Sequence, residues 1–536
     1  MGSFPLWILA IVAGQSPSIY SLVFGCDVGT LGLILVFVSV ADVFMNFVAG
    51  YVQDREYLSM LFPIKSWGRR SPWYATHMPL CILCTCLFFL PPQSSAEEPT
   101  FITYLWFGVL ALVAKWTTTI CFVAVGSASD ELFPAQSERV QIYGWRILTI
   151  WTSVMIAVVA VNLVIGDSDN SPDRCCAAEF EDNLPGRCEQ VTNGTNVSFV
   201  LKEESEKSMS TSLTMSLVCV GASLLGFFAV APLRLAQQPA DVSKIENFRK
   251  NAMEFFRQPS FVYLFMVALL DTTAGQILTV VAPFFMTLVI ALDRKDYATV
   301  LILATFSGMI AQLAGSGICV WLFGTTSESS KTTSVNPRMY AFVSCLLFAA
   351  TQPVLIELCD GGYEDDGETK REGNYAYIVL AFASSRVLLA PLRTWGACAR
   401  GWLIDMDVQR KSGRRREATI NGLLLVAINV GGIVAMLVLT SISWAGIDTR
   451  SCWGENQSKA GVRYVKLIFQ FGIPVMMLIA ALFVWLFPIH GNVLVNLEKS
   501  QRSIFVKTPT MGEISLTKIS PEDTAAEGDR EKEEQP

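Results

Sequence analysis

The sequence predicts an all-α membrane protein in which twelve transmembrane helices form two six-helix bundles, and three observations lead to this prediction. Of the 536 residues, 52% are hydrophobic and only 16% are charged, whereas about a quarter of the residues of a soluble protein are charged. Apolar runs of the ~20 residues that a membrane-spanning helix needs recur along the chain. A polar stretch near the middle separates these runs into two sets of six.

The apolar runs define the order of the predicted spans. They lie at 5–25, 29–51, 73–92, 101–127, 143–166, 211–232, 260–290, 298–322, 338–357, 376–398, 416–444 and 463–489. An even number of spans places both termini on the same side of the membrane. Because the loops 52–72, 233–259 and 399–416 are rich in Lys and Arg, the positive-inside rule makes that side cytoplasmic. The plasma membrane and an endomembrane both remain open as the location.

The domain organisation follows from these spans. Residues 1–232 form the predicted N-terminal bundle, with a long outer loop at 167–210 that we interpret as an acidic, solvated cap. Residues 233–259 form a cytoplasmic linker, and residues 260–490 form the C-terminal bundle. Residues 491–536 are polar and are expected to be a disordered cytoplasmic tail.

The predicted outer loops carry features of an extracytoplasmic face. Three N-glycosylation sequons begin at Asn193, Asn196 and Asn456, and all three fall in these loops. Five cysteines also lie there: Cys175, Cys176, Cys188, Cys359 and Cys452. Since the outer face is oxidising, we expect Cys188 to pair with Cys175 or Cys176, and Cys359 to pair with Cys452. The odd number leaves one thiol unpaired.

Four charged residues fall near the middle of predicted spans: Asp42, Lys115, Asp271 and Arg386. A charge at the bilayer centre costs about 2.5–3.5 kcal/mol on the insertion scale, so pairing or a water-filled cavity is expected. Two interpretations remain open, namely two ion pairs that fix helix packing, or a pathway for a substrate or an ion. Because the four charges sum to zero, they suit a neutral or zwitterionic solute, with Arg386 as a candidate for binding an anionic group. Trp116 is a candidate for stacking on a sugar ring, although anchoring at the membrane interface is the more common role of tryptophan.

The loop after the second span carries a recognisable motif. Asp54 and Arg55 are followed by Trp67-Gly68-Arg69-Arg70-Ser71-Pro72-Trp73. This pattern resembles the loop between spans 2 and 3 of the major facilitator superfamily, and its ending is most similar to the glycoside–pentoside–hexuronide:cation symporter branch. Two further stretches resemble loops of the same branch. They run from Gly126 to Arg146, and from Asp405 to Gly422.

The resemblance implies the major facilitator fold, with alternating access between two bundles and a charged cytoplasmic gate. The gate candidates are Asp54, Arg55, Gly68, Arg69, Arg70, Glu138, Arg139, Arg146, Asp405, Arg414 and Arg415. In this interpretation the basic side chains pair with Asp54, Glu138 and Asp405 when the gate is shut. The alternative is that they only follow the positive-inside rule.

The resemblance also implies a change at the cation site. Cation-coupled members of the branch carry two acidic residues one helical turn apart on span 2, and a further acid on span 4. Asp42 matches the first position, whereas Asn46 at the second is neutral, and span 4 offers Lys115 in place of an acid. We therefore hypothesise that Lys115 pairs with Asp42 in place of a bound cation. Such a pair can carry a proton, so H⁺ coupling or uniport is expected in preference to Na⁺ coupling.

These features predict a secondary transporter for a small, sugar-like polar solute, without a cofactor. The alternative is a non-transporting receptor or scaffold that keeps the transporter fold. An enzyme is disfavoured, because His77 and His490 lie near span ends outside any catalytic or metal motif, and a phosphate-binding loop is missing. The sequence also lacks the basic, aromatic-interleaved patch that nucleic-acid binding requires.

Overall fold

The structure is a computed structural model of the chain. It describes residues 6–9, 20, 26, 28–88, 90–92, 100–133, 136–165, 188–193, 196–201, 221, 233–234, 248–290, 294–324, 336–359, 362–363, 370–371, 374–410, 416–445, 459–490, 493–494 and 496–497. By their internal contacts, Met1–Ile489 form one compact unit and His490–Pro536 form a second. All the helices and strands below belong to the first unit.

The first half of the chain contributes four long helices. They are α3 (Val28–Asp54), α5 (Ser71–Phe88), α6 (Phe101–Leu132) and α7 (Gln136–Ile165). Each coincides with one predicted span. The predicted spans at 5–25 and 211–232 lie almost entirely outside the described residues.

The second half contributes the other six spans. They are α11 (Pro259–Phe284) with the π-helical turn η4 (Phe285–Val289), α12 (Arg294–Gly324), α13 (Pro337–Leu358), α14 (Tyr375–Arg410), α15 (Glu417–Trp444), and α16 (Lys459–Leu467) joined by η5 (Ile468–Gly472) to α17 (Ile473–Leu486). Within the described residues, eight helices are long and apolar enough to cross a membrane. In lipid a helix is favoured because it satisfies every backbone polar group within its own segment.

Helix α3 shows how the sequence suits a membrane. Its exposed side is apolar and carries Leu33, Phe37, Val40, Phe44 and Val48. These residues are three or four positions apart, so they share one helix face. The opposite face is buried and carries Asp42, Asn46 and Asp54. An apolar outside with a polar inside is the arrangement expected of a helix that faces lipid on one side and a polar interior on the other.

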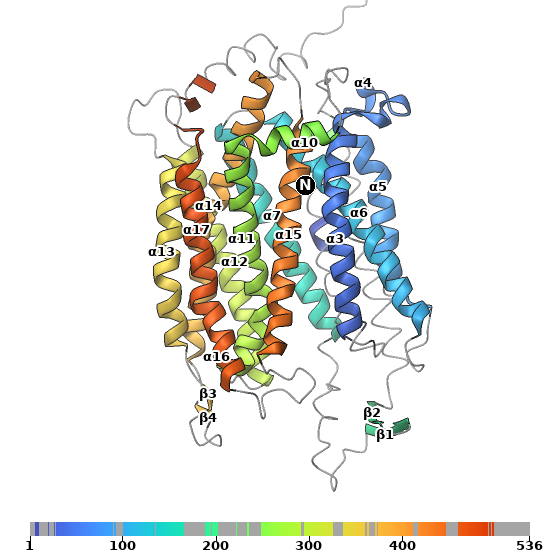
Figure 1. The fold of residues 1–536 in the computed structure, drawn as a ribbon, viewed down its shortest axis with the longest axis vertical. Helices are drawn as coiled ribbons and strands as arrows, with labels where there is room; N and C mark the ends of the chain where they lie inside the picture. The colour runs from blue at the N-terminus through green and yellow to red at the C-terminus, as the bar shows by residue number, and fades with distance from the viewer. Residues whose placement is uncertain are drawn as a thin grey trace, which may run out of the picture. The chain divides into compact units, whose positions relative to one another are not determined.

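Helices from the two halves of the chain pack directly on one another. Contacts join α3 and α6 to α15, and join α7 to α12 and α14, and Figure 1 shows α15 standing beside α3. At the α3–α15 contact a Cβ atom added to Gly50 would lie 2.4 Å from the Ala418 carbonyl oxygen, and one added to Gly422 would lie 2.5 Å from the Asn46 carbonyl oxygen. The two backbones therefore meet where both helices have glycine.

Short elements mark the two ends of the helices (Figure 1). The elements η1 (Tyr57–Met60), α4 (Ile64–Trp67) and α10 (Phe248–Phe256) come from loops predicted to be cytoplasmic. The antiparallel pairs β1 (Cys188–Asn193) with β2 (Asn196–Leu201), and β3 (Gly362–Tyr363) with β4 (Lys370–Arg371), come from loops predicted to be outside. The loops separate to opposite ends, and we call these the charged end and the hairpin end.

The hairpin β1–β2 was not predicted from the sequence. Its register pairs Cys188 with Leu201 and Asn193 with Asn196, so two predicted glycosylation sites flank its turn. Cys359 is buried at the end of α13. The predicted partners Cys175, Cys176 and Cys452, together with Asn456, Arg414 and Arg415, lie outside the described residues.

Candidate functional site

The carboxylate of Asp54, at the end of α3, joins the two halves of the chain at the charged end. One oxygen accepts hydrogen bonds from the Thr419 backbone N–H and hydroxyl, both at 2.7 Å, and the other accepts from the Ala418 N–H at 3.3 Å. These N–H groups belong to the first turn of α15, where a helix presents unsatisfied donors and the positive end of its dipole. Asp54 can make these bonds only while the ends of α3 and α15 lie together.

Two buried arginines surround Asp54. Arg70 donates to Asp54 at 3.0 Å, and Arg69 pairs with Glu56 at 2.7 Å. Both guanidinium groups also lie between 3.5 and 3.9 Å from Glu131 of α6 and Glu417 of α15. We call these six residues the arginine cluster. Burial alone lowers the pKa of Arg69, but the carboxylates of Glu417, Asp54, Glu131 and Glu56 outweigh it and raise that pKa above its ordinary value.

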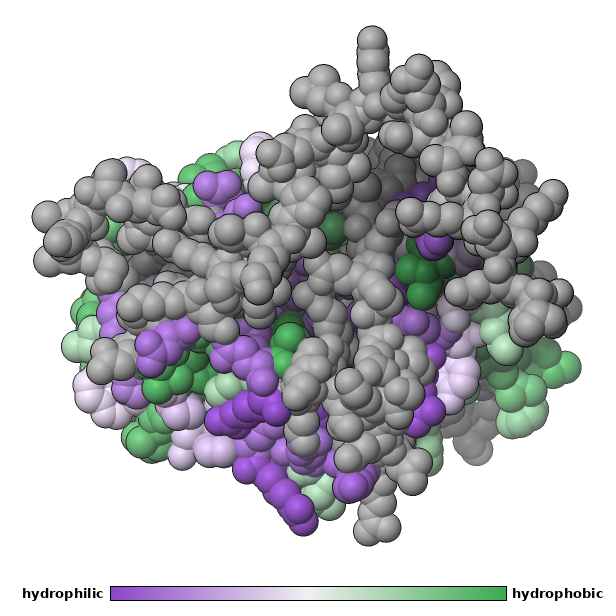
Figure 2. Space-filling view, turned by 90° about the horizontal axis from the view of Figure 1, so that it is seen from above, coloured by the Kyte–Doolittle hydropathy of each residue, from purple (hydrophilic) through white to green (hydrophobic). Residues whose placement is uncertain are grey.

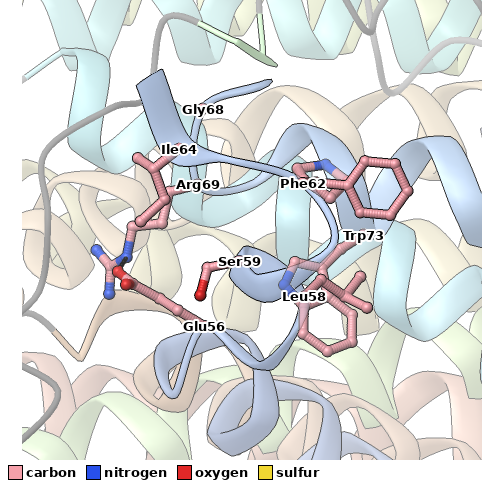
Figure 3. Close-up of a pocket in the computed structure, with 9 residues that line it drawn as sticks. Glu56, Leu58, Ser59, Phe62, Ile64, Gly68, Arg69 and Trp73 are labelled. Atoms are coloured by element: carbon pink, nitrogen blue, oxygen red, sulfur yellow. Dashed lines mark ion pairs between the residues drawn. The ribbon is translucent and has the colours of Figure 1, made fainter. Parts of the chain in front are cut away.

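Gly68 sets the direction of both arginines. Its φ of 70° and ψ of −178° fall in a region that essentially only glycine occupies. A Cβ atom here would also lie 2.5 Å from the carbonyl oxygen of Arg234, whose guanidinium stacks on the Trp67 ring at 4.5 Å. Figure 3 shows Arg69 facing Glu56 beside a cavity that Ser59, Phe62 and Trp73 also line. Its volume of about 10 Å³ leaves room for roughly one water molecule, which is too little for a solute.

Two further acidic residues, Asp405 and Asp130, join the halves at the charged end. Arg139 of α7 donates to both oxygens of Asp405 on α14, at 2.6 and 2.9 Å. Asp130 of α6 accepts from Arg400 of α14 at 3.1 Å and from Asn421 of α15 at 2.9 Å. Such paired, hydrogen-bonded charges are stable when buried, whereas removing one partner leaves a costly unpaired charge.

The remaining gate candidates lie around these contacts. Arg55 stacks on Tyr51, Glu138 is exposed on α7, and Arg146 is half-buried further along the same helix. Arg416 was not among the predicted gate residues. Its guanidinium donates hydrogen bonds to Asp407 and to Glu254 of α10. Figure 2 looks onto the charged end and shows hydrophilic residues gathered between hydrophobic margins.

Deeper in the first half, Asp42 also bridges the halves. It is 2% exposed. One carboxylate oxygen accepts from the Thr119 hydroxyl of α6 at 2.8 Å, and the other accepts from the Asn429 amide of α15 at 2.6 Å. The Lys115 ammonium lies 3.9 Å from the same carboxylate, and the Lys115 side chain is 52% exposed. The lysine contact is therefore longer than the contacts with Thr119 and Asn429, and the lysine side chain is much less buried than Asp42.

The two other candidates near Asp42 have local packing partners. The buried Asn46 amide donates to the Asp42 backbone carbonyl at 2.6 Å. Trp116 packs against an apolar cluster that includes Ala49, Trp73 and Ile120. This placement gives Trp116 a packing role in the described structure.

In the second half, Asp271 pairs with an arginine that the sequence interpretation left out of the membrane centre. Arg393 of α14 contacts both oxygens of Asp271 on α11, at 3.2–3.3 Å, and donates to Gln312 of α12 at 2.9 Å. Arg386, seven residues earlier on α14, instead lies over the Trp151 ring of α7 at 5.3 Å. Arg393 is thus a third basic side chain next to the four charges that the sequence placed near the middle of the spans.

Sequence reasoning missed Thr119, Asn429, Gln312 and Arg393. The side chains of Thr119, Asn429 and Gln312 are uncharged, so they do not stand out in a pattern of hydropathy and charge. Arg393 was detectable, since seven residues are two helical turns and place it on the same face as Arg386. It was overlooked because it lies near the end of its apolar run.

Comparisons with known proteins agree with this geometry. A family model described as MFS/sugar transport protein matches residues 9–491. Among curated proteins, no sequence matches the chain significantly. Solved structures with similar folds include a bacterial homologue of the iron transporter ferroportin in an outward-facing state. It has a TM-score of 0.54 and 10% identity, over 90% of this chain and 97% of that one.

Two transporters of the major facilitator superfamily are also similar in fold. The proton:xylose symporter XylE, bound to 6-bromo-6-deoxy-D-glucose, has a TM-score of 0.54 and 13% identity, over 93% of this chain and 96% of that one. FucP in the outward conformation has a TM-score of 0.54 and 12% identity, over 90% and 97%. At these identities the likeness concerns the fold alone.

The membrane-spanning helices and the polar contacts between the halves define a multi-pass secondary transporter that acts on a small-molecule solute in a lipid bilayer. Since the family model covers most of the chain, the protein belongs to the MFS/sugar transport protein family. It is accordingly a transporter rather than an enzyme.

Proposed function

We propose that this protein moves a small, sugar-like polar solute by alternating access, coupled to a proton that Asp42 carries. The observation that carries the proposal is the position of Asp42, whose carboxylate links α3 and α6 to α15 across the two halves of the chain. The family supports a sugar-like solute, and a proton-coupled sugar symporter has the same fold.

Protonation of Asp42 would change its bonding. An ionised carboxylate only accepts hydrogen bonds, whereas a protonated one must donate from one oxygen. We place the proton on Asp42 Oδ2, where it would oppose the Asn429 N–H that now donates to that oxygen. Binding of a proton there would weaken the α3–α15 link, and this joins proton uptake to separation of the halves.

The charged end supplies the gate in this mechanism. We expect this end to face the cytoplasm, with residues 1–232 and 260–490 moving as two six-helix bundles around the linker 233–259. The arginine cluster, the Arg139–Asp405 pair and Asp130 hold the end shut when they are all formed. Their separation would open the path to the cytoplasmic side.

Na⁺ coupling is disfavoured by the residues around Asp42. A second cation at this carboxylate would meet the Lys115 ammonium, which lies 3.9 Å from Asp42 and already brings a positive charge to it. A proton requires fewer ligands than Na⁺, because the Asp42 carboxylate alone can bind it.

The test is uptake of labelled sugars into proteoliposomes that contain the purified full-length protein, at two pH values, with and without Na⁺. We expect an acidic outside to accelerate uptake of at least one sugar, and Na⁺ to have no effect. The variant Asp42→Asn should lose the response to pH while it still exchanges solute across the membrane.

A matched control is Glu357→Gln, since Glu357 is a carboxylate paired with Lys466 near the hairpin end of the second half. This change should leave the pH response intact. Strong Na⁺-dependent uptake that Asp42→Asn abolishes would refute the proton coupling. If no sugar crosses the membrane under any condition, the sugar-like solute is refuted and the receptor or scaffold alternative gains support.

A further inference from the structure

Arg386 is a cation inside the membrane region with no carboxylate beside it. Among the residues that the structure describes, none of the ion pairs or hydrogen bonds involves its guanidinium group, which instead lies over the Trp151 ring at 5.3 Å. Both oxygens of the Asp271 carboxylate are bound by Arg393, through its Nε and Nη2 groups. A positive charge in this position needs either water or an anion to stabilise it.

The two spans outside the described residues cannot supply that anion. The segments 5–25 and 211–232 contain no Asp or Glu. Away from span ends, Asp42 and Asp271 are the only acidic residues in the twelve predicted spans. Asp42 lies 3.9 Å from Lys115 and Asp271 pairs with Arg393, so neither carboxylate forms an ion pair with Arg386.

The position of Arg386 suits a solute site. Arg386 comes from the second half of the chain and Trp151 from the middle of α7 in the first half. Gly308 of α12 lies against the arginine stem, since an added Cβ atom would be 3.4 Å from Arg386 Cγ. The guanidinium is therefore held from one side by the ring and along its stem by α12, between parts of the chain that alternating access would separate.

We propose that Arg386 is the binding site for an anionic group on the transported solute. This inference rests on the proposed transport function and names the class of solute, a sugar-like molecule with a carboxylate, sulfate or phosphate group. The planar guanidinium presents parallel N–H donors that match two oxygens of such a group. Trp151 covers one face of the guanidinium and leaves the N–H edge for the ligand. The solute supplies the negative charge that the helices lack.

The test compares solutes that differ only in their acidic group. D-Glucose is compared with D-glucuronate and with D-glucose 6-phosphate, and inorganic phosphate and chloride are included as free anions. Binding to the full-length protein is measured by calorimetry, and uptake is measured in proteoliposomes. We expect an acidic sugar to bind at least about 30-fold more tightly than D-glucose, because a buried charge pair is worth that much or more.

The variant Arg386→Gln should remove this preference, and Arg386→Lys should retain part of it. Arg338→Gln is the matched control, since Arg338 also stacks on a tryptophan, Trp485, but lies at the end of α13. It should bind acidic sugars normally. Binding of D-glucose is also measured for Arg386→Gln and Arg338→Gln. A variant that has lost its fold would lose D-glucose binding too, whereas loss of the anion site would affect only the acidic sugars.

Three results would overturn the proposal. They are equal binding of neutral and acidic sugars, an unchanged preference in Arg386→Gln, or binding of inorganic anions alone. If a neutral sugar is taken up and acidic sugars are not preferred, the anion site is refuted and the proposed transport function still stands. Failure of every solute to move, with acidic sugars still bound through Arg386, would instead refute transport alone.

Discussion

Gly68 shows how one residue controls the geometry of the charged end. Its backbone conformation and the nearby Arg234 carbonyl oxygen leave no room for a side chain. We predict that Gly68→Ala destabilises the protein by about 1–3 kcal/mol, the typical cost of a residue forced into a sparsely populated region. The measurement is the thermal unfolding midpoint in detergent, which should fall.

The matched control for this prediction is Gly32→Ala. Gly32 lies on the exposed side of α3, and an added Cβ atom would have no neighbour within 4 Å. Alanine favours a helix over glycine, so this variant should be as stable as the original or more so. Equal midpoints for the two alanine variants would contradict the role given to Gly68.

The central charges show how far single residues could be predicted. Asp42 and Lys115 were identified because a charge inside an apolar run is conspicuous, and the structure places them 3.9 Å apart. The closer partners of Asp42, Thr119 and Asn429, are 77 and 387 residues away in sequence. Nothing in a linear pattern of hydropathy brings such neutral residues together, so only the packed helices reveal them.

At the level of helices and strands, hydropathy predicted where spans exist better than where they end. Helix α14 runs to Arg410, although its apolar run stops at 398, and α7 begins at Gln136 rather than 143. Helices continue into water when their charged ends have partners, as Arg139 and Asp405 do. Between Asn193 and Asn196, which pair across the hairpin β1–β2, the sequence is Gly194-Thr195. A glycine at the first of two connecting residues is a hairpin signal, but this stretch was interpreted only as part of a glycosylation site.

The contact between α3 and α15 provides a prediction at this level. Gly50→Ala would place a Cβ atom 2.4 Å from the Ala418 carbonyl oxygen, so the two helices must move apart. Overpacking of this kind costs about 1–3 kcal/mol. We expect the Ala418 and Thr419 amides, which now bond to Asp54, to exchange hydrogen for deuterium about 10-fold faster or more.

The control is Gly317→Ala on α12, where an added Cβ atom meets nothing within 4 Å. Exchange at Ala418 and Thr419 should then match the original protein. If Gly50→Ala also leaves this exchange unchanged, the close approach of α3 and α15 does not hold the charged end together.

For the molecule as a whole, the decisive feature is that buried charge pairs connect the two halves of the chain. Arg139 and Asp405 are separated by 266 residues, and the pair is almost fully buried. Transport by alternating access requires such a contact to form and break in every cycle. A pair that only followed the positive-inside rule would have no need of its partner on the opposite half.

A charge swap distinguishes these interpretations. Arg139→Asp and Asp405→Arg each leave two like charges together in a buried site, which costs several kcal/mol and should lower uptake at least about 10-fold by opening the charged end. The double variant restores opposite charges and should recover much of the uptake. Recovery measures the coupling between the two positions, as in a double-mutant cycle.

The control swap uses Lys466 and Glu357, which pair at 3.2 Å near the hairpin end, within the second half. Because both lie in the same half and Glu357 is exposed, exchanging them should change uptake little, as expected of surface pairs. If the double variant of Arg139 and Asp405 is no more active than the single ones, while the protein still folds, their pairing does not contribute to the transport cycle. If the double variant of Arg139 and Asp405 recovers uptake, and the swap of Lys466 and Glu357 leaves uptake unchanged, the contact that forms and breaks during transport lies at the charged end, between the two halves.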